Sequence, residues 1–97
     1  MDEQAVREAA EDHAEGTVQG DLRRAGGYLT PEAMAQAKGV MDAFPNPVTS
    51  GAVEDITSEG PDYIVRIRYA GDDKEVTVES RWAERDGSPK LFDMKVL

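Results

Sequence analysis

The stretch that most constrains the fold of this chain is residues 74–86, KEVTVESRWAERD. Val76, Val78, Ser80 and Trp82 occupy alternate positions, with polar or charged side chains between them. Because a β-strand points successive side chains to opposite faces, the pattern predicts a strand with one face turned toward a core. Trp82 is the single tryptophan of the chain and is the expected anchor of that face. The rest of the chain must then supply a layer that covers it.

Upstream of residues 45–47, Pro-Asn-Pro, the apolar residues recur at spacings of three and four. This period predicts helices over residues 2–19, 22–25 and 31–43. Asp21 and Thr30 are good N-caps for the second and third helices, and Gly20 is a good terminator of the first. The Pro-Asn-Pro segment ends the helical half of the chain, because proline cannot continue a helix.

Downstream of that segment the period becomes two, which predicts strands over residues 48–57, 63–69, 74–86 and 89–97. The last strand is expected to turn Phe92, Met94 and Val96 inward, whereas the register of residues 48–57 stays open. Short turns join the strands, so neighbours in sequence should be neighbours in an antiparallel sheet. The order of elements predicts one α+β domain over residues 1–97, with three N-terminal helices packed on one face of a curved four-stranded sheet.

The composition excludes several classes of function. The chain has 20 acidic and 11 basic residues and a net charge of −9, which argues against nucleic acid and against anionic membranes as partners. It has no cysteine, so disulfides and thiolate chemistry are excluded. With one histidine and no cysteine, we expect no metal site and no cofactor. An acidic N-terminal segment is not expected to act as a secretion signal, and a cytoplasmic location is the default.

Two segments resemble the nuclear-transport-factor-2-like superfamily, which includes SnoaL-like and ketosteroid-isomerase-like proteins. The first is VQGDL at residues 18–22, followed by LTPE at residues 29–32. The second is VTVESRWAERDG at residues 76–87, followed by KLFD at residues 90–93. The resemblance implies a cystatin-like cone, in which the sheet curls around the helices. It also implies a homodimer formed through the outer sheet face, which would carry Arg66, Arg68, Thr77, Glu79 and Arg81.

Three residues are candidates for catalysis, although the sequence commits to none. His13 is the only histidine, and it is either a general base or a locally hydrogen-bonded residue at the edge of the core. Tyr28 is either the hydroxyl donor that some members of the family use or a packed tyrosine. Asp93 falls in a region where relatives place an acid or base, but alternation predicts that it lies on the outer face, which counts against catalysis.

An apolar cavity, if present, is expected to be lined by large adaptable side chains: Tyr28, Met34, Met41, Phe44, Trp82 and Met94. The same residues also fill ordinary cores, and a core is the more common role for them. The small Ser80 beside Trp82 marks the expected position of a gap. The leading hypothesis is therefore binding of a small apolar ligand or a protein partner. The alternatives are a SnoaL-like or ketosteroid-isomerase-like lyase or isomerase, and a purely structural or dimerisation domain.

Overall fold

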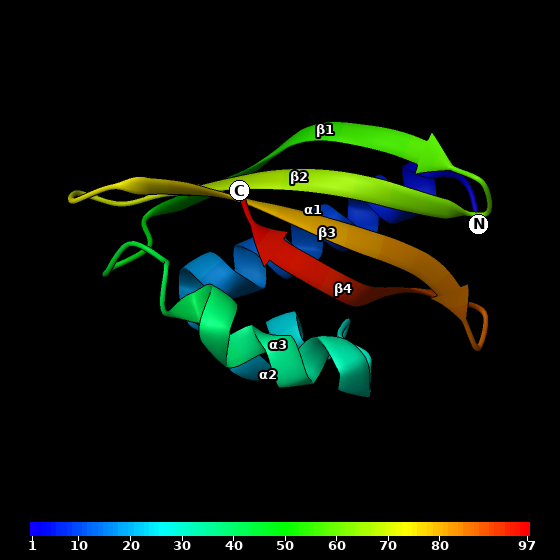
Figure 1. Cartoon of the computed structure of the whole chain (residues 1–97), viewed down its shortest axis with the longest axis horizontal. Coiled ribbons are helices and arrows are strands. Elements are labelled where there is room, and N and C mark those ends of the chain that lie inside the picture. Colours follow the sequence, from blue (N-terminus) through cyan, green and yellow to red (C-terminus); the bar gives the residue numbers. More distant parts are fainter.

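Three helices precede four strands in the computed structural model, which describes residues 1–97 (Figure 1). The strands form one antiparallel sheet in the order β1-β2-β3-β4, so the predicted α+β architecture is confirmed. None of the three helices has the length and apolar character that a membrane-spanning helix requires. The elements are α1 (Glu3–Gln19), α2 (Leu22–Gly26), α3 (Pro31–Met41), β1 (Ser50–Glu59), β2 (Asp62–Ala70), β3 (Glu75–Arg85) and β4 (Ser88–Val96).

The helix boundaries follow from their capping residues. Asp2, Asp21 and Thr30 each accept a hydrogen bond from a backbone amide in the first turn of the helix that follows. Gly20 ends α1 in the left-handed conformation, with a φ of 72°, which glycine adopts without steric cost. The predicted caps Asp21, Thr30 and Gly20 are therefore confirmed, and Asp2 is a further cap. The third helix ends at Met41, two residues earlier than the period predicted.

A β-bulge interrupts β4 at Phe92, directly after the residue that pairs with Trp82. The inserted residue changes the face to which side chains point, so Leu91 enters the core and is 1% exposed. Alternation predicted an inward Phe92, and this is wrong because the strand is not regular there. Met94 does pack against the core as predicted, whereas Val96 near the end of the strand is 37% exposed.

A second bulge, in β1 between Val53 and Asp55, sets the register that the sequence left open. The extra residue allows both Val53 and Ile56 to pack against the core. In a regular strand, two residues at this spacing would point to opposite faces. The strand also begins two residues later than predicted, at Ser50. Regular alternation is therefore a sound guide to β2 and β3, and an incomplete guide to the two edge strands.

The core lies between α1 and the inner face of the sheet (Figure 1). Small residues of α1 allow the helix to approach the strands closely. Trp82 is fully buried, and its indole N–H donates to the Ser80 hydroxyl at 2.9 Å. That hydroxyl donates in turn to the Val65 carbonyl at 3.1 Å. Ser80, beside which a gap was expected, is thus 1% exposed and hydrogen-bonded to Trp82. The buried residues are Val6, Ala9, Ala10, Ala14, Ala33, Val40, Val65, Ile67, Tyr69, Val78, Trp82 and Leu91.

The helix α3 is attached along the β4 edge of the sheet, as Figure 1 shows. The amide of Leu91 donates to the Tyr28 carbonyl at 2.8 Å, just before α3 begins. Within the helix, the amide of Gln36 donates to Asp93 at 2.7 Å, and its oxygen accepts from the Met94 backbone at 2.9 Å. These bonds satisfy part of the open strand edge. They also hold α3 beside the sheet, at a distance from the C-terminal half of α1.

Candidate ligand-binding site

A pocket of about 540 Å³ lies between the C-terminal half of α1, α2, α3 and the loop at residues 42–48. Small-molecule sites in proteins are typically about 300 to 1,000 Å³, so the space is large enough for a ring compound. Nineteen residues line it, and eleven of them are hydrophobic. None of the nineteen is Asp, Glu, Lys or Arg, although charged residues make up 32% of the chain. The pocket is therefore an uncharged surface in a highly charged protein.

Four of the six residues predicted to line a cavity do so: Met34, Met41, Phe44 and Met94. Met34 and Met41 stand at the rim, where they are 52% and 51% exposed. Trp82 does not line the pocket, because it is completely buried beneath α1. Tyr28 also lies outside the lining. The pocket therefore lies next to α3 and not at the gap that was expected beside Ser80.

His13 reaches the pocket from α1, and its orientation is fixed by α2. Its Nδ1 lies 2.9 Å from the carbonyl oxygen of Ala25. The backbones can approach this closely because residue 16 is glycine: a Cβ there would lie 3.0 Å from the Ala25 nitrogen. Burial lowers the pKa of His13 below its ordinary value, although the Ala25 bond and the Asp12 charge act in the opposite direction. The ring is therefore neutral at neutral pH.

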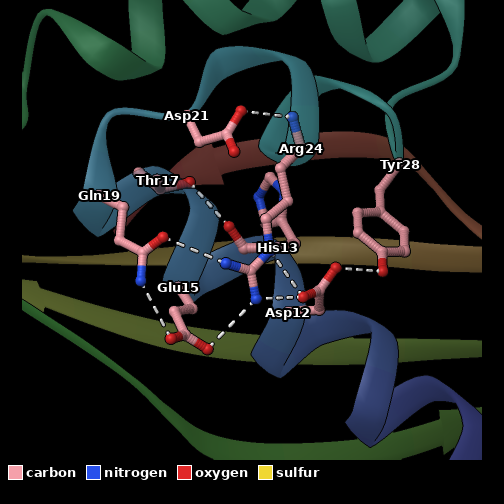
Figure 2. A network of polar contacts seen from close by, with 8 residues as sticks. All are labelled: Asp12, His13, Glu15, Thr17, Gln19, Asp21, Arg24 and Tyr28. Carbon is pink, nitrogen blue, oxygen red and sulfur yellow. Dashed lines mark hydrogen bonds and ion pairs between the residues drawn. The ribbon is translucent and has the colours of Figure 1, made fainter.

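A polar network beside His13, between α1 and α2, engages Tyr28 (Figure 2). The Tyr28 hydroxyl donates to one oxygen of Asp12 at 2.6 Å, and Arg24 Nε donates to the other oxygen at 2.7 Å. The bond from Arg24, followed by that from Tyr28, lowers the pKa of Asp12. Burial and the neighbouring Asp12 raise the pKa of Tyr28 to about 12. The network is a satisfied link between α1 and α2, and it presents no free acid or base to the pocket.

The three candidate catalytic residues therefore do not converge. His13 lines the pocket, and Tyr28 donates to Asp12 outside it. Asp93 pairs with Arg81 on the outer side of the sheet, where alternation predicted it, and it accepts from Gln36 across the strand edge. No carboxylate of the network or of the sheet stands beside His13 in the lining.

The outer sheet face carries the five residues for which a homodimer was predicted: Arg66, Arg68, Thr77, Glu79 and Arg81. Several of these charges pair within the chain. Arg68 lies 3.1 Å from Glu75, and Arg81 forms an ion pair with Glu59. Exposed ion pairs of this kind contribute little stability, so these side chains could exchange them for ion pairs with a second copy of the chain. Dimerisation through this face stays a prediction.

Several pocket residues were missed by the sequence argument, namely Val18, Leu22, Leu29, Val40, Pro45 and Val48. Leu22 is recognisable only from the structure, as an apolar residue that is 67% exposed at the start of α2. The role of Gly16 had no signal at all, since a glycine within a helical pattern does not reveal which backbone approaches it.

Comparison with known proteins places the fold. No family model matches the sequence, and no curated protein matches it. Among solved structures, the chain is similar to an NTF-2-like protein of unknown function from Burkholderia xenovorans LB400. The TM-score is 0.63 and the sequence identity 15%, over 97% of this chain and 84% of the other. The architecture is thus a helix-covered α+β cone, and more particularly it has the NTF-2-like fold that the two sequence segments indicated.

Proposed function

We propose that this chain binds a small, uncharged, apolar molecule in the pocket between α1, α2 and α3. The observation that carries the proposal is the composition of the lining. The pocket has a volume of about 540 Å³, and its lining contains eleven hydrophobic residues and no charged side chain. Moving a charged ligand into such a place would cost free energy that no opposite charge returns. An apolar ligand gains free energy as it leaves water, at roughly 25 cal/mol per Å² of buried surface.

The rim supports the same proposal. Met34 and Met41 expose about half of their side chains, and both border the pocket. Exposed apolar groups that gather around a hollow are typical of binding surfaces. Methionine is also flexible and polarisable, so it adapts to ligands of irregular shape. A bound ligand would cover these two side chains and remove their apolar surface from water.

The alternatives receive less support from the geometry. A lyase or isomerase needs an acid and a base that both reach the reacting atoms. Of the three candidate catalytic residues, only His13 lines the pocket. The Tyr28 hydroxyl donates to Asp12 outside it. A structural or dimerisation role would use the outer sheet face and would not need the hollow. A cytoplasmic location stays a prediction.

The methionines allow a direct test, because the chain has four of them. Met34, Met41 and Met94 line the pocket, whereas Met1 does not. Titration of protein carrying ¹³C-labelled methionine methyl groups with a neutral apolar probe, Nile red, should shift the three pocket signals and leave that of Met1 unchanged. Fluorescence of the same probe should rise as it enters the apolar site.

A matched pair of variants provides the control. Ala37→Trp places an indole in the pocket, since Ala37 belongs to its lining. Ala35→Trp adds the same group to the same helix at an exposed position outside the lining. Binding should be lost in the first variant and kept in the second. Equal binding by both variants, or methyl shifts confined to Met1, would contradict the proposal.

A further inference from the structure

We infer that the ligand carries one hydrogen-bond donor, a hydroxyl or N–H group, and that Nε2 of His13 accepts the bond. The ligand class is then a neutral molecule with an apolar body and a donor at one end, such as a phenol or an alcohol. This inference rests on the proposed function, because it assigns the polar end of a ligand in the same pocket.

The Ala25 carbonyl determines which nitrogen of His13 holds the imidazole proton. Nδ1 of His13 lies 2.9 Å from the Ala25 carbonyl oxygen. A carbonyl oxygen only accepts, so Nδ1 must carry the proton that the bond requires. In a neutral imidazole the second nitrogen then holds a lone pair and accepts. The backbone of α2 therefore fixes His13 as an acceptor on its remaining side.

Nε2 of His13 is available to accept a hydrogen bond. The structure gives Nε2 no protein partner, and no side-chain nitrogen or oxygen in the chain is both sealed from solvent and unpaired. His13 lines the pocket, and Nε2 is the ring nitrogen that remains free to bond a ligand there. The ring is also held from two other sides. Its centre lies 6.0 Å from that of Trp82 and 6.2 Å from that of Tyr28, both in edge-on geometry.

The other polar side chains of the lining are either paired or exposed to solvent. The Thr17 hydroxyl donates to the His13 carbonyl at 3.0 Å. The Gln19 amide bonds Glu15 at 3.1 Å and Arg24 at 3.2 Å, as Figure 2 shows. Asn46 lies at the exposed loop. An apolar ligand without a donor would therefore leave Nε2 unpaired and partly desolvated, which costs free energy.

The test compares two probes of nearly equal shape, 2-naphthol and 2-methoxynaphthalene, by calorimetric titration at neutral pH. Only the first can donate to Nε2. We expect it to bind about tenfold more tightly, which corresponds to about 1.4 kcal/mol. The variant His13→Asn keeps an N–H near the position of Nδ1 and removes Nε2, so the two probes should bind it equally. Circular dichroism checks that the variant is folded.

A second measurement needs no variant. Because the chain has a single histidine, a long-range ¹H–¹⁵N spectrum of untagged protein shows one imidazole. It should report the proton on Nδ1 in the free protein. The Nε2 signal should move when 2-naphthol is added and stay in place when 2-methoxynaphthalene is added.

The outcomes separate the two proposals. Equal affinities of both probes for the unaltered protein, or a proton on Nε2, would overturn the hydrogen bond and leave apolar binding intact. If none of the three probes, 2-naphthol, 2-methoxynaphthalene and Nile red, shifts the methyl signals of Met34, Met41 and Met94, the proposed function is wrong. The inference about His13 is then wrong as well.

Discussion

The two halves of the protein interior differ sharply, although one helix, α1, serves both. Its N-terminal half carries small buried residues, and the sheet packs on it with Trp82 completely buried. Its C-terminal half, from His13 to Val18, faces a pocket of about 540 Å³. The difference arises because Gln36 and the start of α3 are attached to the β4 edge, which keeps α3 away from α1. The packed half should therefore determine stability, and the hollow half should determine binding.

The largest expected effect separates the halves directly. Trp82→Ala should lower the free energy of unfolding by about 3 to 5 kcal/mol, because a fully buried indole leaves a cavity that the sheet cannot close. Met41→Ala, at the half-exposed rim of the pocket, should cost only about 0.5 to 1 kcal/mol. Equilibrium unfolding in urea measures both. Similar losses in the two variants would show that the hollow half is as important for stability as the packed half.

A smaller effect is expected from Ser80→Ala in the packed half. The substitution removes the hydroxyl that accepts from the Trp82 indole at 2.9 Å, so a buried N–H loses its partner. The expected cost is about 1 to 3 kcal/mol, as for other unpaired buried donors. Ser80→Thr keeps the hydroxyl and serves as the control for its loss. An alanine variant as stable as the original protein would mean that the indole finds another partner.

On the hollow side, Gly39→Ala should stabilise the protein by about 0.4 to 1 kcal/mol. Gly39 lies within α3, and a Cβ added there would meet no atom within 4 Å. The matched control is Gly20→Ala, which should destabilise, because Gly20 has a φ of 72°. Thermal unfolding followed by circular dichroism would show the opposite signs. Loss of stability in the Gly39 variant would reveal a constraint on α3 that its open surroundings do not show.

The smallest expected effect is a pH dependence that originates at the boundary between the halves. Folding lowers the pKa of His13, so just below its unfolded value of about 6.5 the unfolded chain binds more protons than the folded one. Stability should therefore fall as the pH drops through this window. The titratable groups beside the ring are Asp12, whose pKa is lowered, and Tyr28, whose pKa is about 12, so neither changes charge there.

The measurement is the free energy of unfolding in urea between about pH 7.5 and pH 5.5, compared with that of His13→Asn. The variant should lack the part of the slope that His13 contributes. A slope that is identical in the two proteins would mean that His13 titrates in the folded state as it does in the unfolded chain.

The sequence predicted those parts of the fold that local chemistry determines. Asp21 and Thr30 identify helix starts because a capping side chain acts within one turn, and Trp82 identifies the inner face of β3 through strict alternation. Phe92 was assigned to the wrong face because a bulge depends on the neighbouring strand, which the local pattern does not contain.

The candidate site was predicted in part, for a similar reason. Met34, Met41, Phe44 and Met94 were identified because large adaptable side chains near a helix edge are typical of cavity walls. Trp82 and Tyr28 were assigned to the same wall, but one is buried in the core and the other donates to Asp12. Only the position of α3 against β4 decides which apolar residues surround space and which fill it.

Gly16 has a consequence that reaches beyond helix packing. It has no side chain, and yet it allows the Ala25 carbonyl to approach His13 and so determines which nitrogen of the ring holds the proton. A Cβ at position 16 would lie 3.0 Å from the Ala25 nitrogen, so a larger residue there requires α2 to shift and strains the bond that holds the proton on Nδ1. If that bond breaks, Nε2 could then either donate or accept, so the pocket would bind ligands with a hydrogen-bond acceptor as well as ligands with a donor. The chemical preference of the pocket would in this way be controlled by a residue that never touches the ligand.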